Sequence, residues 1–347
     1  MKRLCFLLFF LLLSSGCSAK TAPETLWVED IFTQPQSSIE STLPPIAPIE
    51  AGNYVRIENH IEKDELGSYL IYEGGEMHLR LQIRVSELDD KDFGIHLYVD
   101  GQPQAYHTEA SSASSYMHSF RSCNGKEQQA ELIFTPVTGR SGEMLEISFV
   151  LIAYPDYFPD EAWDGTTMID WNSMGLTVRM FYQTDSPCIS PLDVPDRLKA
   201  LSMVYTDLTS AEAKLFSGGT YQKEVEYTFH VNQKKDFGNL FSVKPGDNLE
   251  FEFELKGSHL ADFGLVLYLD HLPISVKPEE LIFLGTENGQ KVTIRAQIDI
   301  SDFDGKEVLY AVLVPRNLRR DDLGGSCLVT VLGPWYLFGS DSMEAAT

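Results

Sequence analysis

The chain has 347 residues and a formal net charge of −24, because 51 acidic side chains outnumber 27 lysines and arginines. Hydrophobic residues make up 43% of it, which is enough to fill two domain cores and excludes global disorder. A chain with this much negative charge repels phosphate backbones and anionic lipid headgroups. Nucleic acid is therefore excluded as a partner.

The N-terminal segment has the features of an export signal. Lys2 and Arg3 precede an apolar stretch at 4–13, which is too short to span a bilayer as a mature helix. No later stretch reaches the roughly 18 consecutive apolar residues that a membrane-spanning helix needs. We therefore expect an exported chain that has no membrane-spanning helix after its signal is removed.

A cysteine follows this apolar stretch closely. Residues 13–18 read Leu-Ser-Ser-Gly-Cys-Ser, and this segment resembles the lipobox of bacterial lipoproteins, in which small residues precede a lipid-modified cysteine. The resemblance implies a signal peptide over 1–16 and a Cys17 that carries acyl chains such as palmitate. It also implies a location on the extracytoplasmic face of the bacterial cell membrane. The alternative is an ordinary secretory signal that is cut after Ala19.

Three further cysteines, Cys123, Cys188 and Cys327, lie in polar, proline-adjacent and apolar surroundings respectively. They do not occupy equivalent places in the two repeats described below, so no duplicated disulfide is implied. One disulfide bridge and three free thiols remain alternatives. No C-x-x-C motif or paired-histidine spacing occurs, which disfavours zinc.

The sequence also carries an internal duplication. Residues 54–103 align without a gap with a segment 170 positions further on. The best-preserved part reads DFGIHLYVD at 92–100 and DFGLVLYLD in the second copy. A period so far above that of solenoid repeats indicates a duplicated domain. We expect the two domains to cover 54–184 and 223–340.

Each repeat is predicted to consist of short strands. Apolar side chains at 79, 81, 83 and 85 alternate with polar ones, and the same period of two returns at 249–255. Asp100-Gly101 is a strong signal for a two-residue hairpin turn, and Asp270-His271 is a weaker one because histidine tolerates positive φ less well.

About seven or eight such strands per repeat predict an all-β fold with two tandem antiparallel β-sandwich domains. Immunoglobulin-like topology is the leading interpretation by analogy, and a jelly roll is the alternative. The Cys…Trp…Cys pattern of true immunoglobulin domains is missing from the sequence.

Two segments have the composition of linkers. Residues 17–53 are rich in Ser, Thr and Pro and are predicted to form a flexible tether. Residues 185–222 connect the repeats, and we expect short helices at Asp196–Met203 and Ser210–Phe216, the second capped by Ser210. A linker of this length predicts some freedom of motion between the domains.

The common sequence motifs of catalysis are absent. There is no G-x-S-x-G elbow, no phosphate-binding G-x-x-x-x-G-K and no dinucleotide-binding G-x-G-x-x-G. His60 and His230 occupy equivalent positions in the repeats, and we interpret them as strand-end histidines that bond to the backbone. We therefore predict that the chain is not an enzyme.

A cluster of carboxylates suggests a metal site. Asp299, Asp302 and Asp304 stand just before Gly305, a spacing that partly resembles a calcium loop. The bidentate glutamate expected further on is absent. The alternative is a hairpin turn, for which Asp and Gly are the usual residues. Calcium is the one cofactor that the sequence suggests, and we otherwise expect none.

The first repeat carries an aromatic insertion that the second lacks. Its candidate ligand-binding residues are Tyr157, Phe158, Trp163 and Trp171. Loops at the end of a β-sandwich commonly bind ligands, and exposed aromatic rings stack on sugars or anchor protein partners. The alternative is that these rings fold back as a small satellite core.

Equivalent strands of the two repeats differ in the charge of their outward positions. Arg80 and Arg84 make this face basic in the first repeat, while Glu250, Glu252 and Glu254 make it acidic in the second. Attraction between the two faces would dock the domains or associate chains head to tail.

Together these features predict a non-catalytic, lipid-anchored surface protein. Its membrane contact is the N-terminal lipid, and its domains bind a cell-surface protein or a glycan, or act as a spacer. The alternative is a cell-envelope polymer hydrolase, or the accessory carbohydrate-binding subunit of one. The sequence predicts no oligomeric state.

Overall fold

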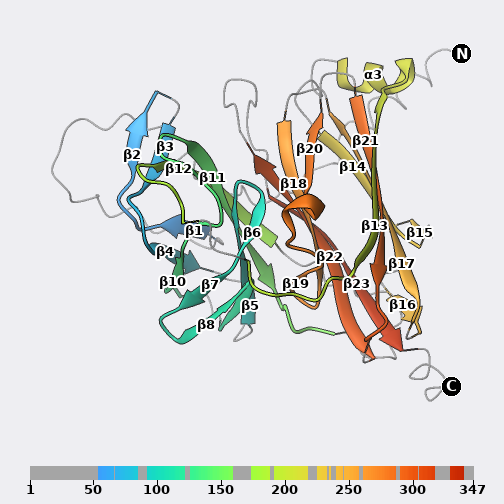
Figure 1. The fold of residues 1–347 in the computed structure, drawn as a ribbon, viewed down its shortest axis with the longest axis horizontal. Coiled ribbons are helices and arrows are strands. Elements are labelled where there is room, and N and C mark those ends of the chain that lie inside the picture. The colour runs from blue at the N-terminus through green and yellow to red at the C-terminus, as the bar shows by residue number, and fades with distance from the viewer. Residues whose placement is uncertain are drawn as a thin grey trace, which may run out of the picture.

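The computed structural model describes residues 54–65, 67–84, 92–121, 126–158, 173–187, 191–217, 225–232, 234–235, 240–244, 246–257, 261–286, 290–303, 305–316 and 329–339. Regular structure in these residues is almost entirely β-strand, in four sheets that form two sandwiches (Figure 1). The predicted all-β fold is therefore confirmed. The signal and tether segments, all five cysteines, Trp163, Trp171 and Asp304 lie outside the described residues.

The first sandwich has one sheet of strand order β1-β4-β10-β7-β8 and one of order β2-β3-β12-β11-β5-β6, with β9 also paired to β5. Neighbouring strands are antiparallel except β3 and β12, which are parallel. The strands are β1 Tyr54–Ile57, β2 Glu62–Asp64, β3 Gly67–Tyr72, β4 Met77–Arg84, β5 Asp92–Val99, β6 Gln102–Gln104, β7 Tyr106–Thr108, β8 Ser111–Ser115, β9 Met117–Arg121, β10 Gln128–Phe134, β11 Met144–Ala153 and β12 Ser173–Tyr182.

The second sandwich repeats this plan with sheets of order β13-β21-β17-β14-β15 and β16-β23-β22-β18-β19, with β20 also paired to β18. Here β16 and β23 are the parallel pair. The elements are β13 Leu198–Asp207, α3 Ser210–Ser217, β14 Val225–Val231, β15 Lys234–Lys235, β16 Leu240–Val243, β17 Asn248–Gly257, β18 Ala261–Leu269, β19 Leu272–Pro273, the 3-10 helix η1 Pro278–Glu280, β20 Ile282–Thr286, β21 Gln290–Asp299, β22 Lys306–Arg316 and β23 Thr330–Gly339.

The strand order is that of an immunoglobulin-like sandwich, in which strands A, B, E and D form one sheet and C, F and G the other. In the first sandwich β1, β4, β10 and β7 take the A, B, E and D positions, and β5, β11 and β12 take C, F and G. In the second, β14, β17 and β21 take A, B and E, and β18, β22 and β23 take C, F and G. The immunoglobulin-like prediction is confirmed, and the jelly-roll alternative is wrong.

Period-two alternation explains the core of each sandwich. In β4 the side chains of Leu79, Leu81 and Ile83 are fully buried against the opposite sheet, while Arg80 between them is exposed. The equivalent strand β17 buries its own alternate side chains in the second core in the same way, namely Leu249, Phe251, Phe253 and Leu255.

The predicted helix at Asp196–Met203 is wrong. Most of this segment belongs to β13, which pairs antiparallel with β21 at the sheet edge where strand D would stand. The unpaired backbone groups of β21 give the segment a ladder of hydrogen bonds that a short isolated helix lacks.

The second predicted helix is present as α3, but its N-cap is Thr209 instead of Ser210. The Thr209 hydroxyl accepts a hydrogen bond from the Glu212 N–H, and the Glu212 carboxylate accepts from the Thr209 N–H at 2.9 Å, which is a capping box.

No helix in the described part of the chain is long and apolar enough to cross a membrane.

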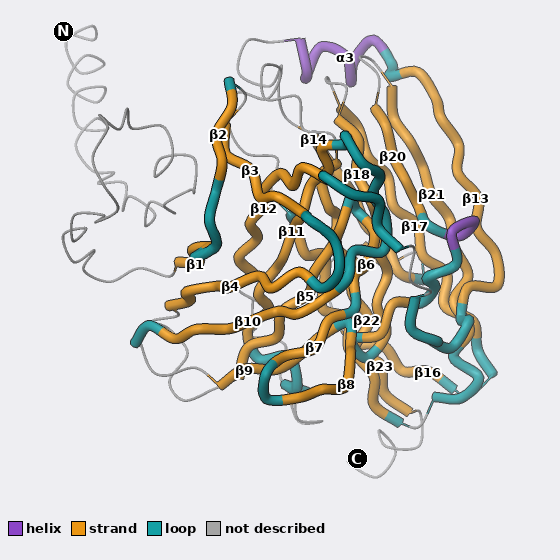
Figure 2. Tube along the Cα trace, turned by 60° about the vertical axis from the view of Figure 1, so that its left-hand side comes forward, coloured by secondary structure: helices purple, strands orange, loops and turns teal. Residues whose placement is uncertain are grey.

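A third apolar cluster joins the two sandwiches. It forms between the outer faces of the two C-F-G sheets, which pack against each other in the middle of a four-layer molecule (Figures 1 and 2). Such an apolar interface does not favour independent domain motion, so the predicted freedom between domains is not supported. The cluster consists of Tyr98, Val150, Ile152, Val266, Tyr268, Val308, Tyr310, Val312, Val314, Val329, Tyr336 and Phe338, with Tyr157, Phe158 and Val331 beside it.

Candidate functional site

A groove of about 710 Å³ lies on the outer face of the second sandwich, on the sheet that is turned away from the first sandwich. Its walls come from β13, β21, β17 and β14, which are neighbours in that sheet. The pairing registers set Ser202, Arg295, Glu252 and His230 in one row across these four strands. Alternation turns this row outward because the residues on either side of Glu252 and Arg295 face the core.

The groove offers hydrogen-bond donors and acceptors side by side. Arg295 Nε donates to Glu252 Oε2 at 2.6 Å, and both side chains remain exposed to solvent. Glu250 and Gln297 extend the polar lining, and Ala200 supplies a small apolar part. His230 Nδ1 is buried and has no hydrogen-bond partner within the described residues. His230 therefore does not make the backbone bond through this atom that its strand-end position suggested.

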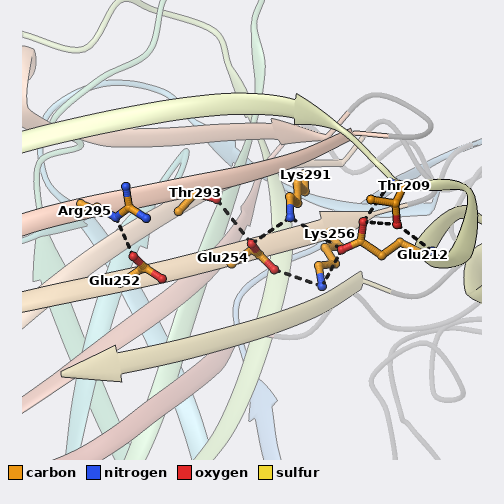
Figure 3. A network of polar contacts seen from close by, with 8 residues as sticks. All are labelled: Thr209, Glu212, Glu252, Glu254, Lys256, Lys291, Thr293 and Arg295. Atoms are coloured by element: carbon orange, nitrogen blue, oxygen red, sulfur yellow. Dashed lines mark hydrogen bonds and ion pairs between the residues drawn. The ribbon is translucent and has the colours of Figure 1, made fainter. Parts of the chain in front are cut away.

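An ion-pair network continues from the groove towards α3 (Figure 3). Glu254 lies 3.0 Å from Lys256 Nζ and 3.3 Å from Lys291 Nζ. Partial burial raises the pKa of Glu254, and its bonds to the two lysines lower it by more, so the net shift is downward. Hydrogen bonds from the Thr209 backbone and hydroxyl, followed by Lys256, lower the pKa of Glu212 to about 2. Glu254 and Glu212 are therefore ionised at neutral pH.

The charged faces do not dock the domains, contrary to the sequence-based prediction. Glu252 pairs with Arg295 within the second sandwich, and Arg80 pairs with Glu131 at 3.1 Å within the first. Both faces belong to the A-B-E sheets, whereas the domains meet through their C-F-G sheets. The ion pairs of each face therefore lie within its own domain.

The two described ligand-binding candidates of the aromatic insertion, Tyr157 and Phe158, are packed. The Phe158 ring lies 4.8 Å from Phe338 and 5.3 Å from Tyr336, measured between centroids, and Tyr157 also meets Tyr336 edge-on. The Lys306 ammonium lies 5.2 Å from the centre of the Phe158 ring. These contacts favour the alternative that the rings of the insertion fold back and pack as a small satellite core. A ligand-binding role for the loop as a whole stays a prediction, because its two tryptophans lie outside the described residues.

The two described carboxylates of the calcium prediction are engaged by cations. Asp299 lies 2.6 Å from Lys199 Nζ, and Asp302 lies 2.7 Å from an Arg197 guanidinium nitrogen. The Lys199 contact, followed by the bond from Ser301, lowers the pKa of Asp299 to about 2. Among the described residues, no three His, Cys, Asp or Glu side chains gather in a way that could hold a metal ion.

The interface between the sandwiches holds a second group of titratable side chains. His96 Nδ1 donates to the Tyr116 carbonyl at 2.9 Å, and His96 Nε2 lies 2.6 Å from the Tyr310 hydroxyl. His271 lies on the other side of Tyr310, and its Nε2 donates to the Pro155 carbonyl at 2.9 Å. A carbonyl can only accept, so the neutral His96 is the Nδ1–H tautomer and Tyr310 donates to its Nε2.

Burial explains the titration behaviour of this interface cluster. Burial, followed by the nearby His271, lowers the pKa of His96 to about 3. Burial also lowers the pKa of His271 and raises that of Tyr310. Buried titratable groups of this kind often mark active sites. Here, however, they lie between packed sheets and contribute nothing to the lining of the groove, so we assign them to domain packing.

The interface has approximate twofold character. Asp100 in the turn after β5 pairs with Arg316 at the end of β22, with Arg316 Nε at 3.1 Å from Asp100 Oδ1. The second sandwich makes the corresponding contact to the first, because His271 in the turn after β18 bonds to Pro155, just beyond the end of β11. His271 holds a φ of +66°, which is costly for histidine, and the hydrogen bond from its Nε2 to the Pro155 carbonyl explains why the turn keeps it.

No protein-family model and no curated protein matches this chain. Solved structures to which it is similar include a Porphyromonas gingivalis W83 protein of unknown function, at 9% identity and a TM-score of 0.21, covering 82% of this chain and 99% of that one. Another is the Salmonella enterica SafA pilin in complex with the SafB chaperone, at 11% identity and a TM-score of 0.21, covering 82% and 96%.

A third is a structure of Clostridium thermocellum CbhA fibronectin(III)-like modules, at 7% identity and a TM-score of 0.18, covering 82% of this chain and 94% of that one. Similarities of this size carry no argument about function. The fold assignment therefore rests on the strand order described above.

Proposed function

We propose that this chain is a non-catalytic binding protein, held on the extracytoplasmic face of a bacterial membrane by lipid on Cys17. The observation that carries the binding role is the polar groove on the outer face of the second sandwich. The C-F-G faces are used for packing the two domains together, so the outer sheet of the second sandwich stays accessible to a ligand.

The chemistry of the groove favours a neutral, hydroxyl-rich ligand such as a glycan. Arg295, Gln297 and Ser202 can donate hydrogen bonds, and the carboxylates of Glu250 and Glu252 can accept them. A sugar needs both kinds of partner at close spacing. Polyanions are disfavoured, because the two carboxylates outnumber the one guanidinium in the groove and the whole chain carries −24.

Binding of the full chain in detergent to an array of bacterial and host glycans tests this proposal. We expect Arg295→Ala to raise the dissociation constant of the glycan about tenfold or more. The substitution removes a hydrogen-bond donor and leaves Glu252 without its counterion. The matched control is Arg80→Ala, which breaks the ion pair to Glu131 on the equivalent face of the first sandwich. Titration calorimetry supplies the affinities.

Three results would count against a glycan-binding site in this groove. Binding that is unchanged in Arg295→Ala would place the site elsewhere, with the aromatic loop around Trp163 as the next place to look. Binding to a cell-surface protein but to no glycan would make the ligand a protein. Turnover of a cell-envelope polymer would support the alternative of a hydrolase.

A further inference from the structure

Strand β13 is an unusual sheet edge. It is ten residues long, and no described strand pairs with its outer side. Every other strand at a sheet edge in the described part of the chain has five residues or fewer. Proteins usually keep edge strands short, charged or interrupted, because an open edge is a template for pairing with another strand.

The side chains of β13 do not protect this edge. Residues 200–206 read Ala-Leu-Ser-Met-Val-Tyr-Thr, with no charge, proline or glycine. Four of the six exposed large hydrophobic residues in the described structure lie on this strand: Leu201, Met203, Val204 and Tyr205, at 38 to 51% exposure. Leu201, Met203 and Tyr205 stand across from buried residues of β21, so they share the core side of the sheet but have no opposite sheet above them.

The first sandwich shows what this edge lacks. There, two further strands follow the E strand β10, namely β7 and then β8. In the second sandwich only β13 follows the E strand β21. The described sheet therefore ends one strand earlier, at the place where its apolar side chains are uncovered.

Strand β13 is complementary to itself in the antiparallel sense. A register centred on Met203 places Leu201 opposite Tyr205 of a second copy, twice by symmetry, and aromatic–aliphatic pairs of this kind stabilise sheets. The charged residues that flank the uncharged run are Lys199 at one end and Asp207 at the other. Antiparallel pairing brings each lysine end beside the aspartate end of the second copy.

We propose that β13 is the surface through which two copies of this chain associate. The two β13 strands pair antiparallel around Met203 and join the outer sheets of two second sandwiches into one continuous sheet. As exposed pairs the end charges add little affinity, because Lys199 already contacts Asp299 and both ends are exposed. They fix direction and register instead, because any arrangement that sets like charges face to face at both ends is repelled. The two grooves then lie on the same face of the joined sheet, where a polymeric ligand could reach both.

Sedimentation equilibrium of the full chain in density-matched detergent tests this association. We expect a concentration-dependent dimer, and we expect Met203→Lys to raise its dissociation constant about tenfold or more, because the substitution sets two lysines face to face at the centre of the pair. The matched control is Leu272→Lys, which replaces another exposed hydrophobic residue, on the short edge strand β19, and is expected to leave the dimer unchanged.

A charge exchange tests the register without disturbing the apolar centre. Asp207→Lys is expected to weaken the dimer, and adding Lys199→Asp is expected to restore it. Circular dichroism melting identifies any variant that fails to fold. If Met203→Lys does not fold, the charge exchange tests by itself whether the two β13 strands pair.

A wild-type chain that stays monomeric at every concentration would overturn the proposal, as would a Met203→Lys chain that dimerises like the wild type. A monomer that instead captures an unrelated extended peptide on β13 would overturn the assignment of a second copy. The readout is mass, so it is independent of glycan binding.

Discussion

Replacing Gly264 by alanine is expected to lower the free energy of unfolding by about 2–3 kcal/mol, because it overpacks the contact between the two sandwiches. Gly264 lies on β18 against the turn after β5. An added Cβ would stand 2.3 Å from the Gly101 carbonyl oxygen and 2.9 Å from the Gly101 Cα. Both are backbone atoms, so relief requires the two sheets to move apart. Urea unfolding of the variant and the wild type measures the difference.

The repeat itself supplies the control for this substitution. Gly94 is the equivalent of Gly264 in the first sandwich, and neither glycine has a positive φ. A Cβ added at Gly94 would meet the Met117 sulfur at 2.5 Å, which is part of a flexible side chain that can move. We expect Gly94→Ala to cost clearly less than Gly264→Ala. Equal losses would mean that the close approach of Gly101 and Gly264 is not a constraint on packing.

Acidification from pH 7 to pH 4 is expected to remove about 3 kcal/mol of stability through His96 alone. The pKa of His96 is about 3 in the folded chain and about 6.5 in the unfolded chain. Between these two pH values the unfolded chain binds a proton at His96 that the folded chain excludes. The contribution of His96 to the free energy of unfolding is therefore intact above pH 6.5 and falls steadily towards pH 3. The lowered pKa of His271 acts in the same direction.

Comparing His96→Gln with the wild type isolates this contribution from that of the many carboxylates. Glutamine can still donate to the Tyr116 carbonyl and accept from Tyr310, but it does not titrate. We expect the melting temperature of the variant to fall less steeply between pH 6.5 and pH 4. His60→Gln is the control, because His60 is exposed and contacts Glu62. Parallel pH profiles for wild type and His96→Gln would refute a buried, neutral His96.

The fold was largely predictable because its signals are local. The duplication gives both sandwiches the same DFG-containing C strand, and alternation in β4 and β17 identifies the buried faces. The Asp-Gly and Asp-His turns both form, with positive φ at all four residues. The segment at 196–203 was mistaken for a helix because nothing in its own sequence reveals that β21 offers it an open edge.

The interface between the sandwiches was missed although the sequence contained a signal for it. Residues 148–154 and 308–314 are almost continuously apolar, a pattern typical of strands buried on both faces. In β11 and β22 one face fills a sandwich core, and the other, including Val150 and Val312, fills the interface. His271 was a second signal, since a poor turn residue at a repeated turn indicates that its side chain has another role.

The groove could not be predicted from local patterns. His230, Glu252 and Arg295 come from three strands, and Ser202 from a strand that was expected to be a helix. Their proximity depends on the pairing register between strands that lie far apart in sequence. Outward polar residues on a strand are also the usual pattern of a solvated face, so nothing in the sequence set these four apart.

Small-angle X-ray scattering tests most directly the claim that the two sandwiches pack through their C-F-G sheets into one rigid body. The measurement uses the chain with Cys17→Ser, diluted until it is monomeric. We expect the scattering of the folded part to match the four-layer arrangement and to stay the same between low and high salt. A two-lobed distance distribution, of the kind that two flexibly linked sandwiches produce, would contradict the account.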